Sequence, residues 1–312
     1  RKEDGTSYSM FRERIMIPIR NRWGRIIAYT ARYIGANPNA PKYINSATSV
    51  LYTKGETLFG IDRAFRLRDA ENFIIVEGAP DALRLQSIGL ENTVASLGTS
   101  WNENQLNLLK RYKSSLCFIP DSDVAPEGQY GPGFKAVMEC GTLAIRKGFH
   151  ATVKELPFGT RELTEEELQE KYEGAIPKDA QREVLVKNDA DSYILSEEIY
   201  RNLREKHFIV WLAEKQFATA SSLLREINCV NQIADLLRYV KDQFVYEQCI
   251  EQLSKIYGKA RLWKDAVTQA RNQAKRAKQP TMMDKQQEET DALRQLNLFV
   301  RNNCYYCLVK DD

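Results

Sequence analysis

The sequence predicts an α/β protein built from three parts. These are a mixed α+β N-terminal subdomain, a parallel-sheet subdomain with helices on both faces, and a helical C-terminal subdomain. Three observations support this: β-type runs near the N-terminus, alternating apolar strands and helices in the middle, and helical periodicity after them. The boundaries that we expect are 1–68, 69–195 and 196–270, and residues 271–312 form a linker and the start of a further domain.

The N-terminal part is rich in β-type segments. Residues 14–20 and 25–32 are two such runs, separated by a turn at 21–24. A second loop leads into a third short run at 42–45.

The central part alternates strand and helix. We expect helices to begin near Pro80, at residue 104 and at residue 134, with glycines ending the first and the last. Such alternation is typical of a parallel sheet covered by helices. The expected strands are residues 73–76, 93–97, 115–119 and 152–156.

Residues 157–186 break this rhythm with a cluster of glutamates and Pro177, so we expect a surface insertion. Apolar residues then recur at three- and four-residue spacing from Ser196 to Ile256, which indicates helices. Residues 271–290 are polar and resemble a linker, and apolar residues return near the end of the chain.

The net charge of +3 is unevenly distributed. Residues 1–68 carry +8, residues 69–200 carry −10, and the remainder carries +5. A basic part beside an acidic part favours a polyanion held next to a carboxylate-rich metal site, although ordinary surface variation is the alternative.

Composition excludes several protein classes. The longest apolar runs are strand-sized, far below the ~20 residues of a membrane span, and no secretory signal is visible. We therefore expect a cytoplasmic protein without a membrane partner, and the missing initiator Met suggests a fragment of a larger one. Six cysteines are scattered, and Cys304 and Cys307 have metal-ligand spacing but no partner pair, so reduced thiols are expected.

Carboxylates follow two of the expected strands. Glu77 ends the first strand, and Asp121 and Asp123 end the third. The carboxyl ends of parallel strands meet at one edge of a sheet, where three acids would repel one another unless a cation such as Mg²⁺ neutralised them. Loop-capping carboxylates are the alternative. No phosphate-binding P-loop and no Ser-His-Asp set is present.

Three further acids are candidates for the same edge. Asp81 lies one helical turn after Glu77, and Asp189 and Asp191 follow the insertion. If residues 184–187 form a strand, the alternate spacing of the last two would point them the same way. We expect at least one of them within ~10 Å of Asp121, close enough to share a metal pair.

These residues resemble a known family. Residues 73–81 together with the Asp-x-Asp at 121–123 resemble the TOPRIM signature, which occurs in primases, topoisomerases and some nucleases. Residues 14–32, 41–46 and 54–60 resemble the polymerase core of bacterial DnaG-type DNA primases. The likeness continues through 94–99 and the acidic box at 188–193.

The resemblance implies a nucleotidyltransferase that makes short RNA primers from ribonucleoside triphosphates on single-stranded DNA, with Mg²⁺ or Mn²⁺ as cofactor. It implies that Glu77, Asp121 and Asp123 form the catalytic metal centre, with Asp81, Asp189 and Asp191 either as further ligands or as residues that support the ligands. A basic ridge would hold template and nucleotide phosphates, and it consists of Arg32, Lys42, Asn45 and Lys54. A replicative helicase, fused or separate, is the implied partner, and a phage or mobile-element origin is expected.

The sequence departs from the family pattern at two places. Ser122 stands where the family has Gly, followed by a lengthened loop at 125–133, and the insertion separates the last acidic pair from the fourth strand. Two other hypotheses therefore stay open. One is a TOPRIM nuclease or topoisomerase, although a topoisomerase needs a catalytic Tyr on a separate domain. The other is a catalytically inactive core that only binds DNA or a helicase.

Overall fold

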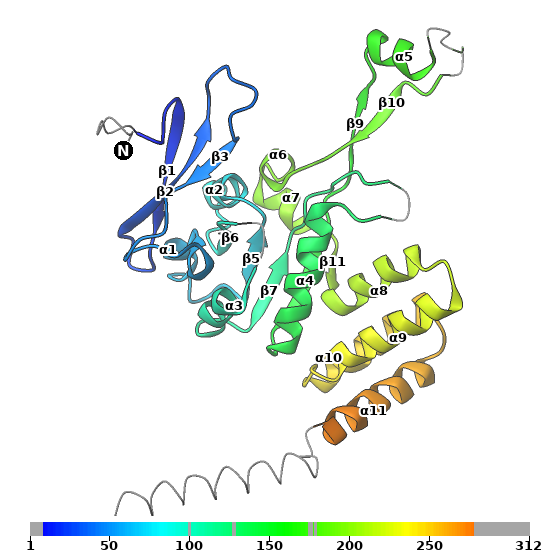
Figure 1. Cartoon of the computed structure of the whole chain (residues 1–312). Coiled ribbons are helices and arrows are strands. Elements are labelled where there is room, and N and C mark those ends of the chain that lie inside the picture. The colour runs from blue at the N-terminus through cyan, green and yellow to red at the C-terminus, as the bar shows by residue number, and fades with distance from the viewer. Residues whose placement is uncertain (1–8, 99–100, 127–128, 174–176, 178–179, 278–312) are drawn as a thin grey trace, which may run out of the picture.

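A six-stranded mixed sheet lies at the centre of the computed structural model, which describes residues 9–98, 101–126, 129–173, 177 and 180–277 (Figure 1). The strand order is β11-β8-β7-β5-β6-β4; the middle four strands are parallel and both edge strands are antiparallel. The strands are β4 (Leu58–Phe59), β5 (Phe73–Val76), β6 (Thr93–Ser96), β7 (Ser115–Phe118), β8 (His150–Lys154) and β11 (Glu205–His207). The four parallel strands are those expected from the sequence, whereas the two short edge strands were not predicted.

Helices cover both faces of this sheet. On β5, Phe73 and Ile75 belong to the core shared with α3, α4 and the C-terminal helices, whereas Ile74 and Val76 pack with α2 and α6. Successive side chains of a strand point to opposite faces, so a strand that is apolar throughout needs cover on both. This confirms the predicted fold class. The helices are α2 (Ala79–Ser87), α3 (Glu103–Lys110), α4 (Pro132–Arg146) and α6 (Ala190–Tyr193).

A separate antiparallel sheet forms the N-terminal part. It consists of β1 (Arg14–Arg20), β2 (Ile26–Tyr33) and β3 (Tyr43–Asn45), paired in that order. The turn between β1 and β2 contains Gly24 at φ +84°, a left-handed conformation that glycine adopts without strain. A short 3₁₀ turn η1 (Lys54–Glu56) and helix α1 (Ile61–Ala64) connect this sheet to β5.

The expected insertion is an arm of β9 (Gly159–Glu162), α5 (Glu165–Lys171) and β10 (Glu183–Val186). It projects away from the central sheet (Figure 1). β10 forms where a strand was expected, but it pairs with β9 and not with the central sheet.

The C-terminal part is helical; its last four helices pack on the face of the sheet that carries α4, whereas its first, α7 (Glu197–Asn202), packs through Tyr200 on the face that carries α2 and α6. The last four are α8 (Phe208–Thr219), α9 (Leu223–Leu237), α10 (Gln243–Ile256) and α11 (Ala260–Ala277). Trp211 and Trp263 are fully buried in this core. Among the described residues, no helix is long and apolar enough to cross a membrane.

Helix α11 extends into the range expected to be a linker. Buried Trp263 and Val267 anchor it, and the Arg271 guanidinium lies over the Tyr246 ring, 5.6 Å from its centroid. Once a helix is anchored, each added residue gains a hydrogen bond, so it continues through a polar segment. The remaining residues, 278–312, with Cys304 and Cys307, lie outside the described part of the chain.

Candidate active site

Two acids meet where neighbouring parallel strands end. Glu77 follows β5 and Asp121 lies just beyond β7, which pairs with β5. Glu77 Oε1 accepts a weak hydrogen bond from the Asp121 backbone N–H at 3.4 Å. The structure therefore brings these two carboxylates together at the carboxyl edge of the sheet, as their positions after parallel strands predict.

Asp123 lies beside these two acids and is hydrogen-bonded to the start of α4. Its Oδ2 accepts a 2.6 Å hydrogen bond from the Gly133 N–H, in the first turn of that helix. A methyl group on Gly133 would lie 2.1 Å from Glu77 Oε1, and one on Gly131 would lie 2.1 Å from Asp123 Cβ. The lengthened loop thus returns to the acids, and its glycines leave the space that the acids occupy.

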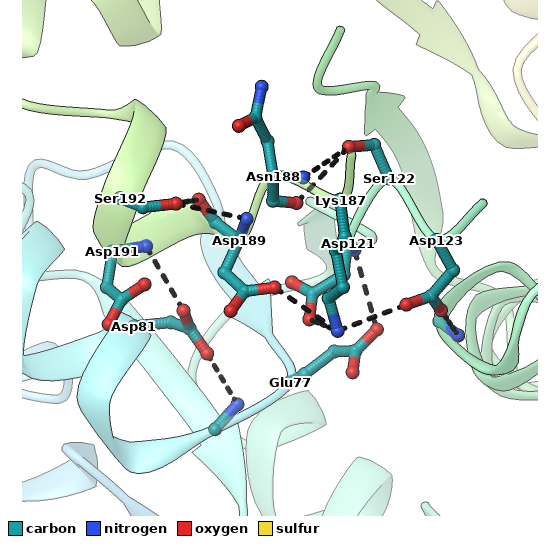
Figure 2. A network of polar contacts seen from close by, with 12 residues as sticks. Glu77, Asp81, Asp121, Ser122, Asp123, Lys187, Asn188, Asp189, Asp191 and Ser192 are labelled. Atoms are coloured by element: carbon teal, nitrogen blue, oxygen red, sulfur yellow. Dashed lines mark hydrogen bonds and ion pairs between the residues drawn. The ribbon is translucent and has the colours of Figure 1, made fainter. Parts of the chain in front are cut away.

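A lysine that the sequence analysis missed lies among the carboxylates. Lys187 Nζ is 2.7 Å from Asp121 Oδ2, 3.0 Å from Asp123 Oδ1 and 3.2 Å from Asp189 Oδ1 (Figure 2). Asp189 and Asp121 contact the same nitrogen, so they are well within the ~10 Å expected for a shared metal pair. The signal was available: Lys187 precedes Asp189 by two residues, and in an extended segment this spacing places both side chains on one side.

Asp81 and Asp191 are held differently. Asp81 Oδ2 accepts from the Gly78 N–H at 3.0 Å, and its Oδ1 accepts from the Asp191 N–H at 3.1 Å. Both oxygens of this buried carboxylate therefore bind backbone donors and join α2 to α6 (Figure 2). Asp191 lines the same cleft as Glu77 and Asp121.

Burial and crowding make these acids hard to ionise together. Burial, then the charge of Glu77, raise the pKa of Asp121, while Lys187 opposes the rise. Burial, then Asp123, likewise raise the pKa of Glu77. Burial raises the pKa of Asp81 to about 6. Burial alone would lower the pKa of Lys187, but the hydrogen bonds that its ammonium donates to Asp121 and Asp123 raise it. The cluster therefore favours a bound cation.

The donor set fits a hard divalent cation. All of the acids offer carboxylate oxygens, and among the described residues the buried Asp121 Oδ1 has no hydrogen-bond partner. Within the described residues, no three His, Cys, Asp or Glu side chains are already arranged around one metal position. The carboxylates are arranged around the Lys187 ammonium instead.

Basic residues form part of the wall of the same cleft. Arg32 and Lys42, at β2 and just before β3, line a cavity of about 430 Å³ together with Glu77, Asp121 and Asp189. Lys54 lies against Gly98, which also lines the cavity. Asn45 is used structurally: its Nδ2 donates to the Leu97 carbonyl at 2.8 Å and ties β3 to the end of β6.

Ser122 connects the acids to both ends of the arm. Its backbone N–H donates to the Asn188 carbonyl at 3.0 Å, and its Oγ accepts from the Asn188 N–H at 2.8 Å. The same Oγ lies 3.2 Å from the Pro157 carbonyl, to which Asn188 Nδ2 also donates at 2.8 Å. The two departures from the family pattern, Ser122 and the insertion, are therefore one structural feature.

Comparison with protein families finds two matches. Residues 1–65 match the N-terminal domain of the DNA primase catalytic core, and residues 74–160 match a Toprim-like domain. A DNA primase of Staphylococcus aureus is 28% identical over 255 residues, which cover 79% of this chain and 39% of the relative. A DNA primase of Rickettsia bellii is 39% identical over 146 residues, which cover 46% of this chain and 23% of the relative. The chain thus spans well under half of the length of these relatives.

Solved primase structures share the fold. The Aquifex aeolicus primase, comprising zinc-binding and RNA polymerase domains, aligns with a TM-score of 0.58 and 26% identity, covering 84% of this chain and 56% of that one. A DnaG primase catalytic domain bound to single-stranded DNA aligns with a TM-score of 0.61 and 23% identity, covering 81% and 73%.

Proposed function

We propose that this chain, which carries the DnaG-type primase N-terminal core and a Toprim domain and is homologous to DNA primases, is the catalytic core of a primase. The reaction would be template-directed synthesis of short RNA primers on single-stranded DNA. One observation carries the proposal: Arg32 and Lys42, in the basic wall, line the same cleft as the acids Glu77, Asp121 and Asp189. A nucleotidyl transferase needs phosphates held next to a carboxylate-bound metal. This cleft offers basic residues for the phosphates and carboxylates for the metal.

Each group of residues has a role in this proposal. Glu77, Asp121, Asp123 and Asp189 would hold Mg²⁺ or Mn²⁺, which when bound activates the attacking hydroxyl and neutralises the leaving pyrophosphate. Arg32, Lys42 and Lys54 would bind template and nucleotide phosphates. Asp81 would position the segment of Asp191, because both of its oxygens are engaged by backbone N–H groups.

A primer-synthesis assay tests the proposal. Labelled ribonucleoside triphosphates are incubated with single-stranded template, Mg²⁺ or Mn²⁺, and either the wild-type chain or Asp121→Asn. We expect short RNA products from the wild type alone. DNA nicking or relaxation without RNA products would favour the TOPRIM nuclease or topoisomerase hypothesis. DNA binding without any reaction would favour an inactive core. Binding of a replicative helicase is a separate expectation, which co-purification with the host helicase would test.

A further inference from the structure

Lys187 is a cation placed at the centre of an acidic cluster by a segment that does not belong to the central sheet. Its ammonium contacts three carboxylates at 2.7–3.2 Å, and those carboxylates come from the ends of β7 and β10. Such distances are typical of charge-assisted hydrogen bonds. The ammonium therefore does electrostatically what a bound metal would do, with one positive charge in place of two.

The backbone next to Lys187 is held by hydrogen bonds, whereas the Lys187 side chain is partly exposed to solvent. Asn188 exchanges hydrogen bonds with Ser122 at 2.8 and 3.0 Å, so the neighbouring peptide is tied to the loop after β7. The Lys187 side chain is 42% exposed, whereas Asp121 and Asp123 are 7% and 10% exposed. A long, partly solvated side chain can swing into water without moving the carboxylates.

We propose that Lys187 is a tethered counter-ion of the metal site. Its ammonium holds Asp121, Asp123 and Asp189 together before a divalent cation binds, and it leaves when the cation enters. Lys187 is thus a positioning residue that also competes with the metal, so it sets the metal concentration at which the site fills. This inference rests on the proposed metal site.

The physical argument is a competition between charges. Without any cation, the ionised carboxylates repel one another in a partly buried cleft, which disfavours the folded state. A divalent ion attracts the same oxygens more strongly than an ammonium does, but it must first displace the lysine. Removing the lysine should therefore destabilise the metal-free protein and tighten metal binding. A lysine with a merely structural role would not produce this combination.

Titration with Mn²⁺, followed by the electron paramagnetic resonance signal of the free ion, tests the proposal at one mildly alkaline pH. We expect Lys187→Met to bind Mn²⁺ about tenfold more tightly than the wild type. Lys187→Arg keeps the charge and should bind like the wild type. Lys171→Met removes a lysine from exposed helix α5 and is the matched control, with unchanged affinity. Lys187→Gln replaces Lys187→Met if the latter does not fold.

Thermal unfolding gives the second readout. In chelator, Lys187→Met should melt below the wild type, and saturating Mn²⁺ should close this gap. Suppose that Lys187→Met binds Mn²⁺ no more tightly than the wild type, while Asp121→Asn binds it clearly more weakly. That result would overturn the role of the lysine but would support the metal site. If Asp121→Asn binds Mn²⁺ as the wild type does, the metal site itself is wrong and the inference falls with it.

Discussion

Asp81 Oδ1 accepts a hydrogen bond from the backbone N–H of Asp191 at 3.1 Å, although 110 residues separate the two in the chain. With the second bond, from Gly78, Asp81 connects the start of α2 to α6. We expect Asp81→Ala to lower the free energy of unfolding by about 1–3 kcal/mol, because two backbone donors lose their acceptor. Urea unfolding measures this.

Mn²⁺ affinity separates the two roles of Asp81. If Asp81 positions the acidic segment, Asp81→Ala should bind Mn²⁺ within about threefold of the wild type once folded. A large loss of affinity without a loss of stability would instead make Asp81 a direct ligand.

Asp121→Asn and Asp123→Asn should each reduce primer synthesis by about 100-fold or more. Even substitutions of residues that only hydrogen-bond to metal ligands reduce metal affinity or activity by about 10–100-fold. Each substitution preserves side-chain volume and removes a hard anionic oxygen. Circular dichroism checks the fold, and a gel assay with labelled ribonucleotides checks the activity. Unchanged activity in both variants would overturn the assignment of Asp121 and Asp123 as metal ligands.

The basic wall of the cleft should determine how binding of single-stranded DNA depends on salt. Lys42→Ala and Lys54→Ala should each weaken binding and flatten the log–log salt slope by about 0.7, the value for one phosphate contact on a single strand. Fluorescence anisotropy over a salt series measures this, with Lys171→Ala on the arm as control. Parent-like affinity and slope in both variants would place the phosphate contacts elsewhere.

Gly133→Ala tests the fit between α4 and the acids. The new methyl group would lie 2.1 Å from Glu77 Oε1 and 3.1 Å from Asp123 Oδ2, so the Glu77 carboxylate must move. A misplacement of this size costs about 100-fold in rate when it affects a reacting group. The free energy of unfolding should change by only about 1 kcal/mol, which is the difference in helix propensity between Ala and Gly.

Primer synthesis and urea unfolding, measured on the same preparation of Gly133→Ala, check these two expectations. Glu139→Ala, at an exposed position of α4, is the control. Full activity in Gly133→Ala would show that the position of Glu77 is not critical.

His207 should make the protein less stable in acid. Its Nδ1 accepts from the Ile209 N–H at 3.3 Å and caps α8, and its ring lies 5.2 Å from that of His150. Burial, then His150, lower the pKa of His207 from 6.5 to about 3. The unfolded state therefore binds the proton first. The contribution of neutral His207 is complete above pH 6.5 and is lost as the pH falls, by up to about 1.4 kcal/mol per pH unit.

Urea unfolding at several pH values, compared between the wild type and His207→Asn, isolates this effect. Asn caps helices well and does not titrate in this range. Lys241 and Asp242 line the cavity beside the two histidines and are unchanged in the variant, so their contributions cancel. Parallel stability curves for the two proteins would contradict the assignment.

The sequence by itself determined the parallel strands and the acids at their ends. Apolar runs such as β5 are local signals, and parallel strands necessarily bring their carboxyl ends to one edge, so Glu77 and Asp121 were placed without coordinates. The position of Asp123 at the same edge follows from its spacing, because it lies two residues after Asp121.

Only the tertiary structure decided the contacts that depend on the path of the arm. The bond between Ser122 and Asn188, and with it the entry of Lys187 into the acidic cluster, joins segments 66 residues apart. The pairing of β11 with β8 and the meeting of His150 with His207 are equally non-local. Periodicity reports which side of its own element a residue occupies, whereas these contacts depend on where separate elements pack, and packing is set by the whole core.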